Sequence, residues 1–211
     1  MNNIILAIVA VGEDYIEPAN EVIDKLSDKW DIHVLTDNPK KINWSDCFVE
    51  LQDNKIFSYF DKMLFVLRLV EEYKTGVLYI DVDRVFEHSE RFLNDFINTN
   101  QVTILNYWPE GKDFKPLYSA GKHFVPFVKY CNNNDLDYDI DTFSEELFYI
   151  PYMSDISKII YDVEKVKPLF EYQSLISRET NMYYPNIGNA EGLALSYALK
   201  KNKHTIRKYE R

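Results

Sequence analysis

The sequence predicts an α/β fold in which helices flank a mainly parallel central sheet. Over the first hundred residues, apolar runs of strand length alternate with stretches whose apolar residues recur at helical spacing. The runs are almost continuously apolar, which is typical of strands buried on both faces. Because such alternation builds successive βαβ units, it favours a parallel sheet covered by helices on both sides.

The first βαβ unit begins with residues 4–11, a continuous apolar run that Gly12 ends. Pro18 then stands where the first turn of a helix tolerates proline, and the helix is expected to reach about residue 30. Residues 31–36 form the second strand, which the turn signal Asp37-Asn38-Pro39 closes. The apolar residues of the helix recur at spacings of three and four and form one stripe: Ile16, Ala19, Val22, Ile23 and Leu26.

The remaining elements follow from the same periodicities. In the first half they are a short strand at 48–51, a helix at 59–74, a strand at 77–80, a helix at 89–97 and a strand at 101–105. In the less regular second half they are an outer strand at 146–151 and helices at 155–169 and 193–201. We expect one domain over residues 1–211, with a first half to about residue 105, a second half from about 106 to 199, and a basic C-terminal tail at 200–211.

Composition and charge restrict the class of protein. With 46% apolar residues among 211, the chain can bury a substantial core, and its net charge of -10 argues against general binding of nucleic acid or anionic membranes. Cys47 and Cys131 lack the spacing of metal ligands or redox pairs. No basic leader precedes the first apolar run, and no apolar stretch is long enough to cross a bilayer. We therefore expect a soluble protein of the reducing cytoplasm.

The basic tail differs in charge from the rest of the chain. Such a run is usually a solvated terminus, although it could hold phosphate or contact a polyanionic acceptor or a membrane surface. Its basic residues, set against Glu210, are Lys200, Lys201, Lys203, Arg207, Lys208 and Arg211.

The most informative segment is Gly76–Phe86, in which an apolar strand ends in the two carboxylates Asp81 and Asp83. In extended backbone, residues two apart point to the same side, so these carboxylates are expected about 6 to 7 Å apart and facing one way. At a half-buried edge they would repel each other by about 2 to 3 kcal/mol, which favours a bound cation. Mg²⁺ and Mn²⁺ prefer such oxygen ligands, often together with substrate phosphates. The alternative is a solvated polar turn that needs no ion.

Ligands of open parallel sheets bind beyond the carboxyl ends of the strands. Three predicted strands end in this way, so their last residues are expected to line one crevice. These residues are Ala10, Val11 and Gly12 after the first strand, Thr36 and Asp37 after the second, and Asp81 and Asp83 after the strand at 77–80.

The segment from Phe57 to Asp83 resembles the nucleotide-sugar glycosyltransferases of the GT-A fold that carry an Asp-X-Asp motif, most closely the small family 8-type enzymes. The resemblance rests on the basic residues Lys62 and Arg68 of the predicted helix, followed by Gly76 and the strand that ends in Asp-Val-Asp. It implies a nucleotide-sugar-binding first half and an acceptor-binding second half. By motif it covers about residues 57–86, and by organisation about the first 105.

The resemblance also implies roles for single residues. Asp81 and Asp83 would hold Mn²⁺ or Mg²⁺ against the diphosphate of a nucleoside diphosphate sugar, most simply a UDP-sugar, while Asp81 or the backbone at Val82 touches ribose. Lys62 would support the acidic motif or the phosphates, and it could equally be an ordinary surface lysine. The residues implied around base and ribose are Ala10, Val11, Thr36 and Asp37.

The second half offers fewer candidates. Glu191 is the candidate catalytic base, which an inverting enzyme needs and a retaining enzyme does not, although it could simply complete a helix start. Family 8-type enzymes supply a late histidine to the metal, and His204 stands in a comparable position without the surrounding motif, so it could instead be a surface histidine. Three aromatic residues could stack on sugar rings or pack in the core: Tyr107, Trp108 and Tyr118.

The function that these residues predict is metal-dependent transfer of a hexose or pentose from a nucleoside diphosphate sugar to a hydroxyl acceptor. A glycan or lipid-linked saccharide is the expected acceptor, and a hydroxylated base in DNA is an alternative because the basic tail could hold phosphates. Nucleotidyl transfer also uses paired aspartates and metal, but Gly12-Glu13-Asp14 is a poor phosphate loop. A third alternative is a non-catalytic binding module of the same fold.

Overall fold

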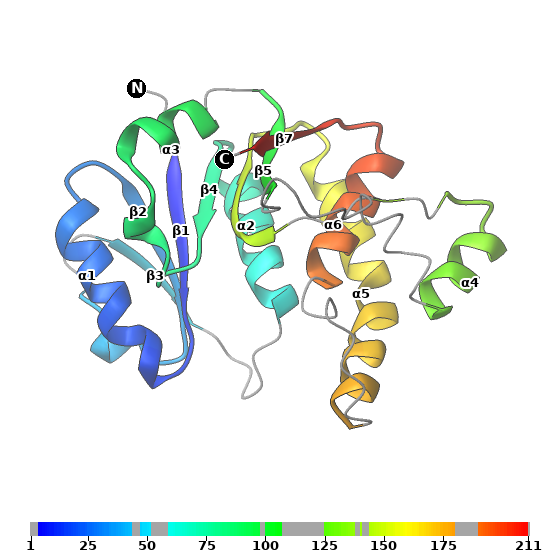
Figure 1. The fold of residues 1–211 in the computed structure, drawn as a ribbon, viewed down its shortest axis with the longest axis horizontal. Coiled ribbons are helices and arrows are strands. Elements are labelled where there is room, and N and C mark those ends of the chain that lie inside the picture. Colours follow the sequence, from blue (N-terminus) through cyan, green and yellow to red (C-terminus); the bar gives the residue numbers. More distant parts are fainter. Residues whose placement is uncertain are drawn as a thin grey trace. The chain divides into compact units, whose positions relative to one another are not determined.

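The computed structural model describes residues 4–43, 47–51, 59–97, 100–106, 125–137, 140, 144–179 and 190–210. The chain divides into two compact units (Figure 1). The first unit comprises Met1–Thr103 and Glu146–Ser154, and the second comprises Ile104–Glu145 and Asp155–Arg211. No helix in the described ranges combines the length and the apolar character needed to span a bilayer.

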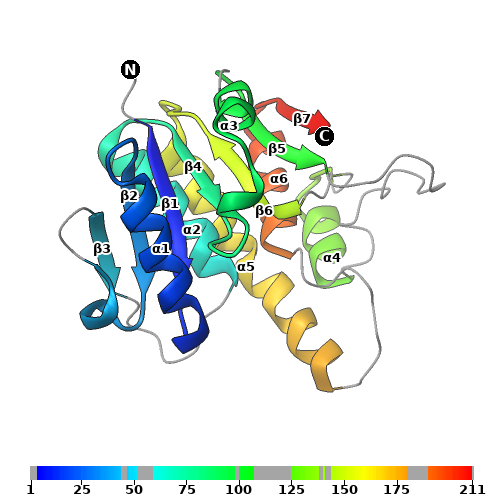
Figure 2. The ribbon, with the colours of Figure 1, turned by 60° about the vertical axis from the view of Figure 1, so that its left-hand side comes forward.

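The first unit is built on a mixed, mostly parallel sheet. Its strands follow the order β3-β2-β1-β4-β6, and Figure 2 shows β1 between β2 and β4. β1 pairs in parallel with β2 and β4, β2 pairs in parallel with β3, and β6 pairs with β4 antiparallel. The predicted α/β fold with a mainly parallel sheet is confirmed. The bounds of the strands are Ile5–Ala10 (β1), Asp31–Thr36 (β2), Cys47–Leu51 (β3), Val77–Ile80 (β4) and Ser144–Ile150 (β6).

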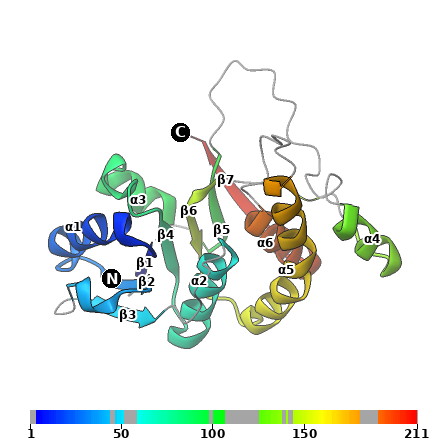
Figure 3. The same cartoon turned by 90° about the horizontal axis from the view of Figure 1, so that it is seen from below.

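Helices cover both faces of this sheet. Figures 1 and 3 show α1 (Ile16–Leu26) and α2 (Tyr59–Tyr73) on opposite sides of the strands. The predicted stripe of α1 is buried at Ile16, Ala19, Val22 and Ile23, whereas Leu26 is only partly covered. α1 ends at Leu26, four residues before the predicted limit, because the chain turns over residues 27–29, where the N–H groups of Lys29 and Trp30 donate to the carbonyl of Leu26. A third helix, α3 (Glu90–Ile97), starts at the hydroxyl of Ser89, which accepts the N–H of Phe92.

The second unit is mainly helical. It contains α4 (Val125–Asn133), α5 (Ile156–Glu179) and α6 (Ala190–Lys201), with α5 packed against α6. It also holds most of β5 (Val102–Asn106) and its neighbour β7 (Ile206–Glu210). The segment expected as a solvated basic tail is therefore largely folded, because its first residues close α6 and residues 206–210 form a strand.

Gly76, the residue before β4, lies against the ring of Tyr149 from β6. A Cβ atom at this position would lie 2.2 Å from the hydroxyl oxygen and 2.7 Å from the Cζ atom of Tyr149, which is 6% exposed. Such distances are too short for non-bonded atoms. We therefore expect Gly76→Ala to lower the free energy of unfolding by about 1 to 3 kcal/mol, the usual cost of overpacking. Chemical denaturation checks this, and the double variant Gly76→Ala/Tyr149→Leu should recover part of the loss.

His33 of β2 is a buried titratable residue. Its side chain is 1% exposed and its ring contacts those of Phe48 and Tyr73, each at 4.8 Å between centroids. Burial lowers the pKa of His33 below its ordinary value of 6.5, and the nearby carboxylates of Asp31 and Glu72 oppose this shift without cancelling it. The unfolded chain therefore binds the proton first as the pH falls, so His33 lowers stability below about pH 6.5.

The expected result is a pH-dependent melting temperature that His33 controls. Between about pH 7.5 and about pH 5.5 the melting temperature of the wild type should fall further than that of His33→Leu, because leucine cannot take up the proton. Thermal unfolding at the two pH values measures both differences. Equal decreases in the two proteins would show that other groups govern acid sensitivity in this range.

Candidate functional site

The candidate site lies at the carboxyl end of β4. Asp81 follows this strand directly, and its Oδ1 accepts a hydrogen bond of 2.6 Å from the hydroxyl of Tyr79. The ammonium of Lys62, from α2, lies 3.6 Å from the same oxygen. The side chain of Lys62 is 7% exposed and that of Asp81 is 31% exposed. Tyr79 and Lys62 thus fix one oxygen of Asp81, while part of the Asp81 side chain is exposed to solvent.

The backbone turns immediately after Asp81. The N–H of Arg84 donates to the carbonyl of Asp81 at 2.8 Å, which closes a turn over residues 81–84. The extended geometry that we expected for Asp81 and Asp83 was therefore wrong, because β4 ends at Ile80. The N–H of Asp81 still bonds to the carbonyl of Glu146 in the neighbouring β6, at 2.8 Å, so the first of the two aspartates is anchored to the sheet.

The two residues after Asp81 differ in exposure. Val82 is buried at 4% and Asp83 is exposed. Beside them, the guanidinium of Arg84 bonds to the Glu87 carboxylate at 2.7 Å. This hydrogen bond, aided by the charges of Glu87, Glu146 and Asp83, raises the pKa of Arg84. The turn therefore presents one exposed carboxylate next to a fixed cation.

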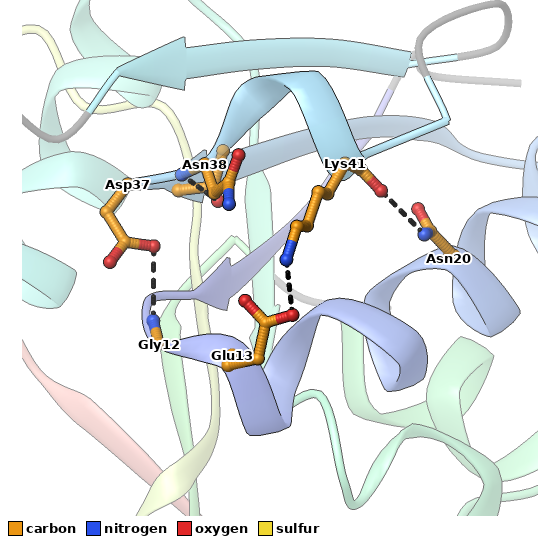
Figure 4. Close-up of polar contacts among 7 residues, drawn as sticks. Gly12, Glu13, Asn20, Asp37, Asn38 and Lys41 are labelled. Atoms are coloured by element: carbon orange, nitrogen blue, oxygen red, sulfur yellow. Dashed lines mark hydrogen bonds and ion pairs between the residues drawn. The ribbon is translucent and has the colours of Figure 1, made fainter.

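The ends of β1 and β2 lie at the same edge of the sheet as the end of β4, since these strands are parallel. Ala10 pairs with Thr36, and both are fully buried. Beyond them the N–H of Gly12 donates to Oδ1 of Asp37 at 3.1 Å (Figure 4). Gly12 has a φ of 96°, a left-handed conformation that glycine adopts without strain. The exposed carboxylate of Asp37 is thereby fixed against the turn after β1.

A second set of contacts joins the segments after β1 and β2. Lys41 forms an ion pair with Glu13, and its carbonyl accepts a hydrogen bond of 2.8 Å from the side chain of Asn20 (Figure 4). The turn after β1 also carries Asp14, so its first residues are acidic. These contacts hold the two loops at the sheet edge together. They also engage Lys41 with Glu13 and the N–H of Gly12 with Asp37, whereas a phosphate-binding loop would direct its N–H groups and cations at the ligand.

The candidates in the second half lie in the second unit. Nε2 of His204 lies 2.9 and 3.0 Å from the two oxygens of Asp155, the residue before α5. Glu191 belongs to the first turn of α6, and its side chain is outside the described residues. The aromatic candidates Tyr107, Trp108 and Tyr118 also lie outside them.

Two residues near the candidates were missed by sequence reasoning. Tyr79 stands two residues before Asp81, so strand alternation alone would have placed both on one side. The contact between Asp155 and His204 could not be predicted from a local pattern, because the two residues lie 49 positions apart in the chain. Within the described ranges, no three histidine, cysteine, aspartate or glutamate side chains cluster as metal ligands. An ion at Asp81 and Asp83 would need further ligands from substrate or water.

No protein-family model and no curated protein matches the chain. Among solved structures, 4-diphosphocytidyl-2C-methyl-D-erythritol synthase from Anaerococcus prevotii aligns with 99% of this chain and 87% of its own, at 11% identity and a TM-score of 0.50. At this identity the likeness shows a shared α/β fold.

Two glycosyltransferase structures are also similar to the chain. The galactosyltransferase LgtC, in complex with donor and acceptor sugar analogs, aligns with 96% of this chain and 72% of its own, at 12% identity and a TM-score of 0.48. Mouse xyloside xylosyltransferase 1, in its apo form, aligns with 97% and 84%, at 10% identity and a TM-score of 0.40.

Proposed function

We propose that this chain is a glycosyltransferase that moves a sugar from a nucleoside diphosphate sugar to a hydroxyl acceptor. The observation that carries the proposal is the carboxylate of Asp81, which follows a central parallel strand and is held through one oxygen by Tyr79 and Lys62. Ligands of such sheets bind at this edge. A carboxylate that is oriented here and still partly exposed is suited to an ion or a ligand rather than to packing.

The residues at this edge fit a hard divalent cation. Oδ1 of Asp81 bonds to Tyr79 and lies near Lys62, so Oδ2 is the oxygen proposed to bind the ion. Asp83 adds an exposed carboxylate two residues later. One or two carboxylates with substrate phosphates are the usual ligands of Mg²⁺, and Mn²⁺ takes the same donors. When bound, the ion would supply positive charge to the departing diphosphate. Lys62 is buried, so its proposed role is to orient Asp81 rather than to touch phosphate.

The nucleoside is proposed to bind across the ends of β1 and β2. Oδ1 of Asp37 accepts the N–H of Gly12, and its second oxygen is proposed to accept a hydrogen bond from a ribose hydroxyl. Acidic residues after the second strand of dinucleotide-binding folds bind ribose in the same way. Ala10, Val11 and Thr36, at the ends of these strands, are proposed to border the nucleoside. A UDP-sugar is the donor we propose first.

The acceptor chemistry is proposed from the second unit. Glu191 would take the proton of the acceptor hydroxyl if the reaction inverts the anomeric centre, and a retaining reaction needs no such base. His204, whose Nε2 bonds to Asp155, is proposed as a further ligand of the ion. A glycan or lipid-linked saccharide in the cytoplasm is the proposed acceptor.

The acidic turn after β1 favours glycosyl over nucleotidyl transfer. A phosphate-binding loop after β1 would offer N–H groups or cations to a triphosphate. Here the N–H of Gly12 is already bonded to Asp37, Lys41 is engaged by Glu13, and Asp14 adds a negative charge. A thermal-shift screen of nucleoside diphosphate sugars and nucleoside triphosphates, with and without Mn²⁺, separates the two. Stabilisation by one diphosphate sugar only with Mn²⁺, followed by its slow hydrolysis, is expected. Release of pyrophosphate from a triphosphate would instead identify a nucleotidyltransferase.

A further inference from the structure

We infer that Tyr79 is a positioning residue that selects which oxygen of Asp81 faces the ion and the diphosphate. This inference rests on the proposed function. Tyr79 is not expected to touch substrate, because it is 1% exposed. It acts through its hydroxyl, which donates to Oδ1 of Asp81 at 2.6 Å.

Two ring contacts and the pairing of its backbone fix Tyr79. It stacks on Phe148 of β6 at 4.9 Å between centroids, and the ammonium of Lys62 lies 5.1 Å from its centre. Its backbone is held in β4 between β1 and β6, paired with Ala7 and with Phe148. The hydroxyl is thus presented to Asp81 by a rigid support, whereas Asp81 itself lies just beyond the strand in a turn.

The consequence is a carboxylate with two unequal oxygens. A free carboxylate rotates about its Cβ–Cγ bond and offers either oxygen, at an entropic cost when it is fixed. Here both the tyrosine hydroxyl and the lysine ammonium are directed at Oδ1, so Oδ2 is the oxygen presented to a cation. Pre-orientation of this kind by a neighbour that does not itself bind metal commonly changes metal affinity 10- to 100-fold.

The test is Tyr79→Phe, which keeps the stacked ring and removes only the hydroxyl. Affinity for UDP, or for whichever of CDP, ADP and GDP the wild type binds best, is measured by calorimetry with Mn²⁺ and again with EDTA. The affinity with Mn²⁺ divided by the affinity with EDTA should be about 10-fold smaller in the variant than in the wild type. Because each ratio compares a protein with itself, a loss of stability common to both conditions does not change it.

Two further comparisons make the measurement more specific. Tyr149→Phe removes another buried tyrosine hydroxyl, one that packs against Gly76, and should keep the wild-type ratio. In an Asp81→Asn background, Tyr79→Phe should cause no further loss, since Tyr79 acts through Asp81. An unchanged ratio in Tyr79→Phe, with a wild type that responds to Mn²⁺, would overturn the role of Tyr79 and leave the proposed function standing. A wild type with no Mn²⁺ response for any of the four diphosphates would overturn both.

Discussion

Asp83→Ala is expected to lower Mn²⁺-dependent hydrolysis of the donor sugar by about 100-fold or more while leaving the fold intact. In the proposed site this carboxylate is one of two that hold the ion. The loss of one such electrostatic contact to the departing diphosphate is worth about 3 kcal/mol, which corresponds to a factor of about 100 in rate. Asp83 is exposed and follows a turn, so its removal should change the free energy of unfolding by about 0.5 kcal/mol or less.

A matched control distinguishes the loss of a metal ligand from the general loss of one surface negative charge. Asp28→Ala removes another exposed aspartate, from the turn after α1, and it should change neither hydrolysis nor melting temperature. Hydrolysis is measured by release of the nucleoside diphosphate at saturating Mn²⁺. Turnover by Asp83→Ala at the wild-type rate would remove the proposed metal site and the mechanism that depends on it.

The strands of the first unit were predictable because their signal is local. Residues 31–36 and 77–80 were predicted as strands, and the structure gives β2 and β4 the same bounds. Each is a short apolar run closed by a polar turn, so side-chain chemistry within a few residues decides it. The parallel order of β1, β2 and β4 then follows from alternation with α1 and α2.

The surroundings of the candidate site depend on contacts that no local pattern encodes. The sequence placed Asp81 and Asp83 after a strand, but the turn that separates them depends on a backbone bond from Arg84. The burial of Lys62 depends on its place in α2 beside the ring of Tyr79, and the anchoring of Asp81 depends on β6, which is 65 residues away at Glu146. Distant strands and helices must pack before these features exist, so periodicity does not reveal them.

Lys201→Met is expected to destabilise the protein by about 3 kcal/mol or more, the largest stability effect among these changes. The carboxylate of its partner, Asp162 of α5, is 2% exposed. Lys201 contacts one oxygen at 2.5 Å, and Asn202 donates to the other at 2.8 Å. Without the lysine, a buried negative charge keeps only a neutral donor, and breaking a buried pair in this way typically costs about 3 to 5 kcal/mol.

Thermal unfolding measures this loss as a decrease in melting temperature of roughly 6 °C or more for a chain of this length. Lys200→Met is the matched control, because the neighbouring lysine pairs with the exposed Asp137 at 2.7 Å and should contribute about 1 kcal/mol or less. The double variant Lys201→Met/Asp162→Asn should recover much of the stability, since it removes the stranded charge together with its partner. If Lys201→Met melted like Lys200→Met, the ion pair between α5 and α6 would be too hydrated to hold these helices together.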